Sequence, residues 1–300
     1  MKKYFVVLMV IAFMLSGIGC ASDDVNIDAI DGLDPIGQIV ITGSPTLGQV
    51  LTQLVVEFAE ENITWDMVDS SFPREEIDIV INGGGSGAGV SAVIDKTASF
   101  GLISRNVSEE EQAKFDKFNQ YQLGIDALTI SVNPENKIHE IHENLTTEEL
   151  QKIFSGEYKY WEELNPALPY GEIVVVTRDI GGGAHEVFQQ KIMGELEVSP
   201  HTIQSPSMGA LVTKIIENKN AIGYASYGVV NQNKGELIPL LVDGVSPTKE
   251  NILNGEYKIS RPILMLYNGE LDPREEALLH FITSNRGMDV IEERGFVPNR

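Results

Sequence analysis

Hydrophobic positions follow two different periods along the chain from about residue 38 onward. Short apolar runs are typical of buried strands, and apolar residues at i, i+3 and i+4 are typical of helices. The predicted strands cover residues 38–42, 77–81, 99–103, 125–132, 172–177, 221–224 and 262–267. The predicted helices cover residues 47–61, 87–95, 184–193, 208–217, 273–284 and 286–294, with further helices starting at Ser108 and after Thr146. This alternation predicts an α/β fold with largely parallel sheets.

Two of these helices carry clear end signals. Ser108 precedes three glutamates, whose charge complements the positive end of the helix dipole. Thr146 and Glu149 have the spacing of a capping box, and Gly156 is placed to end the same helix.

Three glycine-rich loops each follow a predicted strand and open a predicted helix. They cover residues 41–48, 82–89 and 178–184. A helix N-terminus offers unpaired N–H donors to an anion, and glycine lets the backbone approach a ligand closely. With Arg178 beside the third loop, the pattern predicts a protein that surrounds a small oxyanion.

The N-terminus has the pattern of an export signal. Residues 1–20 contain two lysines, then an apolar run over residues 5–15, and then small residues up to Cys20. Cys20 is the only cysteine, and the segment resembles a bacterial lipoprotein signal, although Gly17 stands where a larger aliphatic residue is usual. Lipidated Cys20 would anchor the protein to the cell membrane on its extracytoplasmic side; the alternative is an ordinary signal that is discarded. Residues 21–36 are predicted to form a flexible tether.

The charge of the chain excludes one class of partner. The formal net charge is −22, and without Lys2 and Lys3, 20 basic residues face 44 acidic ones, which gives −24. Nucleic-acid binding needs clustered Lys and Arg, so we expect none. A closed anion site depends on local donors, so the acidic surface does not exclude one.

Motifs along most of the chain resemble the phosphate-binding lipoproteins of Pst-type ABC phosphate importers. Their order and spacing carry the resemblance, from about Gly37 to the C-terminus. The motifs lie at residues 42–46, 83–89, 100–105, 154–156 with Trp161, 175–179, 221–224, 242–245 and 260–262.

The resemblance implies a two-lobed, type II periplasmic-binding-protein fold with a hinged cleft between the lobes. Residues 37–124 and 260–300 would form lobe one, and residues 125–259 would form lobe two. The protein would be a monomeric receptor without enzymatic activity or cofactor, delivering inorganic phosphate to an ABC permease. It would touch the membrane through its lipid anchor only.

The resemblance also implies a set of ligand-binding residues. In lobe one these are Ser44, Pro45, Thr46, Ser86, Gly87, Ser104 and Arg105. In lobe two they are Arg178, Gly182, Gly183 and Ala184.

The chain departs from the family pattern at several of these positions. Gly182, Gly183 and Ala184 stand where Ser-Gly-Thr is usual, and Pro45 replaces a hydroxyl residue. Some family members place an aspartate, which accepts the proton of hydrogen phosphate, near the position of Arg105. Arginine cannot accept a hydrogen bond, so Arg105 is either a ligand contact or part of an inter-lobe ion pair. Candidate replacement acceptors are Asp126, Asp179 and Glu186.

Some of these residues also fit other kinds of site. Residues 83–88 approximate a dinucleotide fingerprint, which the export signal disfavours. His139, His142 and Glu143 suggest metal ligands, but a solvated loop without metal is preferred. His185 is either a ligand donor or an exposed first-turn histidine.

Two other functions stay open. The receptor could bind another tetrahedral oxyanion or a phosphate ester. A secreted phosphoester-processing enzyme is the less favoured alternative, because no nucleophile, metal site or catalytic carboxylate pair is recognisable from spacing.

Overall fold

A computed structural model describes residues 38–180 and 183–300 of the chain. The predicted signal at residues 1–20, Cys20, the tether at residues 21–36 and Gly182 lie outside the described residues. Within that part of the chain, no helix is both long and apolar enough to cross a membrane.

A strand lies at every predicted apolar run, although those predicted at residues 125–132 and 262–267 are longer than expected, and the described residues contain five further short strands that were not predicted. The strands are β1 (Ile39–Gly43), β2 (Ile79–Asn82), β3 (Phe100–Ile103), β4 (Phe118–Val132), β5 (Asn144–Leu145), β6 (Val174–Arg178), β7 (Ile203–Ser205), β8 (Ala221–Ser226), β9 (Ile238–Pro239), β10 (Leu241–Val242), β11 (Ser260–Asn268) and β12 (Val297–Pro298).

The predicted helices are also present, together with several short ones that the pattern did not indicate. They are α1 (Pro45–Asn62), α2 (Trp65–Val68), α3 (Gly85–Ile94), α4 (Glu109–Gln112), α5 (Ile138–Ile141), α6 (Thr147–Ser155), α7 (Trp161–Leu164), α8 (Gly183–Phe188), α9 (Met208–Ile216), α10 (Tyr227–Gln232), α11 (Lys249–Leu253), α12 (Pro273–Ile282) and α13 (Asn285–Glu293). The predicted single helix over residues 184–193 is instead α8 followed by a π-helical turn, η1 (Gln189–Met193).

Both predicted end signals are confirmed. Ser108 and Glu111 form a capping box at α4, and Thr146 and Glu149 form one at α6. Gly156 ends α6 with a φ of 81°, a left-handed conformation that glycine adopts without strain.

The main sheet is mixed rather than largely parallel. Its strand order is β2-β1-β3-β11-β4-β8-β6-β7, and β12 and β9 also pair with β4. The β1–β2, β1–β3, β6–β7 and β6–β8 pairs are parallel, whereas every pair that involves β4 or β11 is antiparallel.

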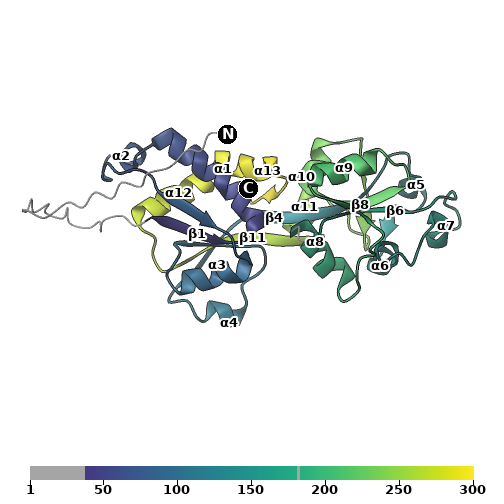
Figure 1. Cartoon of the computed structure of the whole chain (residues 1–300), viewed down its shortest axis with the longest axis horizontal. Coiled ribbons are helices and arrows are strands. Elements are labelled where there is room, and N and C mark those ends of the chain that lie inside the picture. Colours follow the sequence, from purple (N-terminus) through teal and green to yellow (C-terminus); the bar gives the residue numbers. More distant parts are fainter. Residues whose placement is uncertain (1–37, 181–182) are drawn as a thin grey trace, which may run out of the picture. The chain divides into compact units, whose positions relative to one another are not determined.

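The antiparallel pairs arise because β4 and β11 run side by side in opposite directions between the two parts of the sheet (Figure 1). The first part of β4 pairs with β11, and its last residues, Leu128–Val132, pair with β8. β4 leads the chain from the first part of the sheet to the second, and β11 leads it back. The two strands therefore run antiparallel.

Separate apolar cores form along the two ends of β4. One contains Val90, Ile103 and Leu264 between α3, β3 and β11. The other is larger and includes a stack of Phe188 on Tyr224, with ring centroids 4.5 Å apart. These two clusters lie in different lobes, and α1 adds further buried apolar residues that belong to neither cluster, among them Leu47, Leu51 and Phe58. The exact lobe boundaries between residues 124 and 125 and between 259 and 260 stay a prediction.

Candidate functional site

Three serines from the predicted lobe-one loops meet in one hydrogen-bonded chain. The hydroxyl oxygens of Ser44 and Ser104 are 2.6 Å apart, and the Ser104 amide donates to Ser86 Oγ at 3.0 Å. Ser44 follows β1, Ser86 lies in the first turn of α3, and Ser104 follows β3. They meet because β2, β1 and β3 are parallel neighbours, whose carboxyl ends share one edge of the sheet.

The helices at this edge lack the side-chain caps seen elsewhere in the fold. Ser44 is the N-cap residue of α1, and its side chain makes no capping hydrogen bond; the N-cap residue of α3 is Gly84, which has no side chain to cap with. The Ser44 hydroxyl bonds to Ser104 instead. First-turn N–H groups without a side-chain cap remain available to an anion.

Glycine allows α3 to pack this close to the strands. A Cβ on Gly89 would lie 2.9 Å from the carbonyl oxygens of both Thr42 and Leu102. That separation is well inside van der Waals contact, so a larger residue would push α3 and Ser86 away from Ser44 and Ser104.

A cavity of about 470 Å³ opens on the serine chain, and we call it the serine cavity. Glu186 and Arg261 also line it. The predicted ligand residues along its wall are Ser44, Pro45, Thr46, Ser86, Gly87, Ser104, Arg105 and Gly183.

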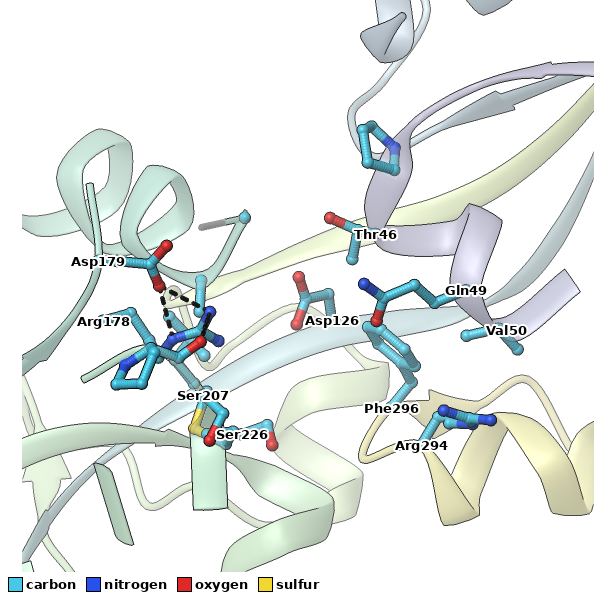
Figure 2. Close-up of a pocket in the computed structure, with 16 residues that line it drawn as sticks. Thr46, Gln49, Val50, Asp126, Arg178, Asp179, Ser207, Ser226, Arg294 and Phe296 are labelled. Carbon is cyan, nitrogen blue, oxygen red and sulfur yellow. Dashed lines mark hydrogen bonds and ion pairs between the residues drawn. The ribbon is translucent and has the colours of Figure 1, made fainter. Parts of the chain in front are cut away.

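The remaining described ligand residues lie in a second cavity of about 490 Å³, which we call the Arg178 cavity (Figure 2). Arg178 and Ala184 line it, and it shares Pro45, Thr46 and Gly183 with the serine cavity. Figure 2 shows Asp126 between Thr46 and Gln49 on one side and the Arg178–Asp179 pair on the other. The structure therefore brings the predicted residues into two adjoining cavities rather than one.

Arg105 is held by a local carboxylate. Its Nη1 and Nη2 donate to the two carboxylate oxygens of Glu111 at 2.8 and 2.7 Å. This hydrogen bonding lowers the pKa of Glu111 to about 2. The partner is six residues away in sequence, so the inter-lobe ion pair that was one reading of Arg105 is wrong.

Arg178 is oriented by a carboxylate and by the backbone. Its Nε and Nη2 donate to Asp179 Oδ1 at 3.1 and 2.8 Å, and also to the carbonyl oxygens of Ser205 and Pro206 at 3.2 Å. Asp179, a candidate acceptor for a ligand proton, is thus the counter-ion of Arg178.

His185 is buried, so the expectation of an exposed histidine is wrong. His185 lies in α8, and its side chain is buried. Its Nδ1 lies 3.1 Å from Tyr224 Oη, and that oxygen accepts a hydrogen bond from the Arg178 amide at 3.0 Å. Burial lowers the pKa of His185. The side chain lines neither cavity.

His139 and His142 also differ from the expected solvated loop. Both are half-buried, in and after the short helix α5. His139 Nε2 lies 2.9 Å from the Pro134 carbonyl, and His142 Nε2 lies 3.1 Å from Glu149 Oε1. Among the described residues, no group of His, Cys, Asp and Glu side chains could hold a metal ion.

Arg261 is the site residue that the sequence analysis missed. It stands opposite Asp126 in the β11–β4 register, and both side chains are 6% exposed. Its Nε donates to Asp126 Oδ2 at 3.2 Å and its Nη1 to Glu186 Oε2 at 2.9 Å. The only sequence signal was the motif at residues 260–262, which carries the family resemblance without indicating a role.

Comparisons with known proteins agree with this architecture. A family profile described as a PBP superfamily domain matches residues 32–286. The phosphate-binding protein PstS of Staphylococcus saprophyticus is 27% identical over 274 residues, covering 87% of this chain and 80% of that protein.

Solved structures of other proteins share the fold of this chain. An ABC-type phosphate transport receptor from Vibrio cholerae is 25% identical, with a TM-score of 0.67 over 87% of this chain and 99% of that one. A Clostridium perfringens protein crystallised with bound phosphate is 25% identical, with a TM-score of 0.59 over 88% of this chain and 100% of that one. The family profile covers most of the length of this chain. The chain therefore belongs to the PBP superfamily and has a two-lobed binding-protein fold.

Proposed function

We propose that this chain is a receptor that captures inorganic phosphate between its two lobes and delivers it to an ABC importer. The observation that carries the proposal is the chain of Ser44, Ser104 and Ser86 at two helix N-termini without side-chain caps. Hydroxyls and N–H groups gathered at one cavity suit a small anion rich in acceptor oxygens. The relatives named for phosphate binding and phosphate transport support the choice of anion.

The proposed ligand contacts follow from the two cavities. Ser44, Thr46, Ser86, Gly87, Ser104 and Arg105 would hold phosphate from lobe one, with Pro45 shaping the wall. Arg178, Gly182, Gly183 and Ala184 would close over it from lobe two. The lobes would comprise residues 37–124 with 260–300, and residues 125–259.

The proposal includes the protein's place in the cell. Lipidated Cys20 would anchor a monomer to the extracytoplasmic face of the membrane, with residues 21–36 as the tether. The receptor would act without catalysis or cofactor. Among the described residues, Ser44 bonds to Ser104 and Ser86 accepts the Ser104 amide, which supports a binding role for these hydroxyls.

A phosphate ester is the second candidate ligand. The Arg178 cavity adjoins the serine cavity through Thr46 and Gly183, and it has room for the alcohol portion of such an ester. Inorganic phosphate would leave that space to water.

Calorimetry on the full chain, purified in detergent, tests these alternatives. Phosphate, arsenate, sulfate and glycerol 3-phosphate are titrated into the protein at the same ionic strength. We expect phosphate to bind with a higher affinity than sulfate or glycerol 3-phosphate. Heat from sulfate or the ester, with none from phosphate, would refute phosphate as the ligand.

A pair of serine variants locates the site. Ser86→Ala removes one hydroxyl from the serine cavity, and a hydrogen bond to a charged group contributes about 1.5–3 kcal/mol, so phosphate affinity should fall roughly ten- to hundredfold. Ser91→Ala is the matched control, because Ser91 lies on the exposed side of the same helix α3. Equal affinities for the two variants would remove Ser86 from the site.

A further inference from the structure

Arg261 joins elements that lie far apart in the sequence. Besides Asp126 on β4 and Glu186 on α8, its Nη2 donates to the Gly183 carbonyl at 3.1 Å and to Thr46 Oγ1 at 3.4 Å. Thr46 and Gly183 open α1 and α8, so Arg261 contacts both helix starts.

The guanidinium has a donor to spare. Arginine carries five N–H donors. The contacts with Asp126, Glu186, Gly183 and Thr46 use four of them among the described residues, which leaves one N–H on Nη1. Arg261 lines the serine cavity, so an anion held there lies within its electrostatic reach.

The other two candidate arginines are placed less well for this cavity. Arg105 lines the serine cavity, but its Nη1 and Nη2 both donate to the Glu111 carboxylate. Arg178 lines the adjoining cavity and is held by Asp179.

We propose that Arg261 is a ligand-binding residue of the phosphate site and that Glu186 competes with the anion for its guanidinium. This inference rests on the proposed function. Asp126 is the buried counter-ion that keeps Arg261 in place, since its Oδ2 meets Nε on the opposite side of the guanidinium from Nη1.

Glu186 is suited to be the competitor rather than a fixed partner. Its side chain is 58% exposed, whereas those of Arg261 and Asp126 are 6% exposed. An exposed carboxylate moves away from Arg261 at little desolvation cost, because water replaces the lost hydrogen bond. Its negative charge also stands on the wall of a cavity that receives an anion.

The test compares phosphate affinity across charge-matched variants. Glu186→Gln removes the competing charge and should tighten phosphate binding about three- to tenfold at low ionic strength, with a smaller gain at physiological salt. Glu195→Gln makes the same change of net charge at an exposed residue that lines neither cavity, and its affinity should equal that of the wild type. Arg261→Lys keeps a positive charge for Asp126 but loses the planar fork, so binding should weaken at least about tenfold.

Each outcome decides the inference. If Glu186→Gln binds phosphate no better than the wild type, Glu186 does not compete with the anion. If Arg261→Lys keeps wild-type affinity, Arg261 is not a ligand-binding residue. If Arg261→Lys does not fold, the comparison of Glu186→Gln with Glu195→Gln decides alone. A wild-type chain that binds neither phosphate nor arsenate overturns the proposed function and, with it, this inference.

Discussion

Three arginines of the site each pair with a carboxylate, whereas Arg294 on the wall of the Arg178 cavity donates to the side-chain oxygen of Gln53. Arg105 pairs with Glu111, Arg178 with Asp179, and Arg261 with Asp126 and Glu186. An arginine with a local counter-ion is held in one orientation, and its net charge is reduced. The carboxylates that orient these three arginines therefore also reduce the positive charge that the arginines bring to the cavities.

The pKa of Glu111 yields a stability prediction. Its folded value of about 2 lies below its ordinary value of 4.5, so its stabilising contribution is complete above about pH 4.5 and is lost as the pH falls toward 2. Glu111→Gln should therefore lower the free energy of unfolding by about 1 kcal/mol at neutral pH and by much less near pH 2, a small value because solvent screens the half-exposed Arg105. Urea unfolding at both pH values measures the difference.

Glu110→Gln is the control for that measurement. Glu110 is 86% exposed and pairs only with Lys114 on the helix surface, so its removal should change little at either pH. A Glu111→Gln variant whose deficit stays constant between neutral pH and pH 2 would contradict the assignment of the shift to Glu111.

At the scale of elements, some helix N-termini are capped by a side-chain hydrogen bond and others are not. The starts of α4, α6, α9 and α13 receive a hydrogen bond from a serine or threonine side chain. The starts of α1 and α3 at the serine cavity do not, and neither do those of the short helices α2, α5 and α10. Capping stabilises a helix, and a helix end without a cap keeps its donors for a ligand.

The capping box of α6 gives a prediction about stability alone. Thr146 Oγ1 accepts the Glu149 amide at 3.2 Å, and Glu149 Oε2 accepts the Thr146 amide at 2.8 Å. Thr146→Ala should lower the free energy of unfolding by about 1 kcal/mol and leave phosphate affinity unchanged. Denaturant titration and calorimetry measure the two quantities.

Thr52→Ala is the matched control for this cap. Thr52 is exposed in the interior of α1, where alanine has the higher helix propensity, so no loss of stability is expected. Equal losses from the two threonine variants would show that capping is not the cause.

On the scale of the whole molecule, Thr46 at the start of α1 lies directly beside Gly183 at the start of α8. A Cβ built on Gly183 would lie 2.4 Å from Thr46 Oγ1 and 2.9 Å from Arg261 Nη2. Only a glycine allows this contact without a shift of one loop. The geometry of the shared wall of both cavities therefore depends on the absence of a single side chain.

Gly183→Ala should weaken phosphate binding by about tenfold, because relieving an overpacked contact costs roughly 1–3 kcal/mol. Adding Thr46→Ala removes the hydroxyl nearest to the new methyl group, so the double variant should recover part of the lost affinity, while the close contact with Arg261 Nη2 remains. Calorimetry on the four proteins of this double-mutant cycle measures the coupling.

Gly209→Ala is the control for an added methyl group. A Cβ there meets no atom within 4 Å, and Gly209 lies in α9, so the variant should keep its affinity and gain stability. Additive losses in the Gly183 and Thr46 cycle would contradict a direct clash between the two residues.

The longer strands and helices were predictable from the sequence, because apolar periodicity and capping residues act within a few positions along the chain. The capping box of α6 was predicted, whereas the one at Ser108 was found only in the structure. The loops around Ser44 and Ser86 follow their strands as expected, and their parallel order brings the serines together. The ligand role of these residues stays a prediction.

The partners of the site side chains follow from the way the chain folds, not from its local sequence. The tertiary structure buried His185, turned Arg105 toward Glu111, divided the predicted residues between two cavities and placed Arg261 among them. Arg261 lies 75 residues from Glu186, 135 from Asp126 and 215 from Thr46. No local pattern encodes contacts over such separations, because they exist only once β11 has returned beside β4.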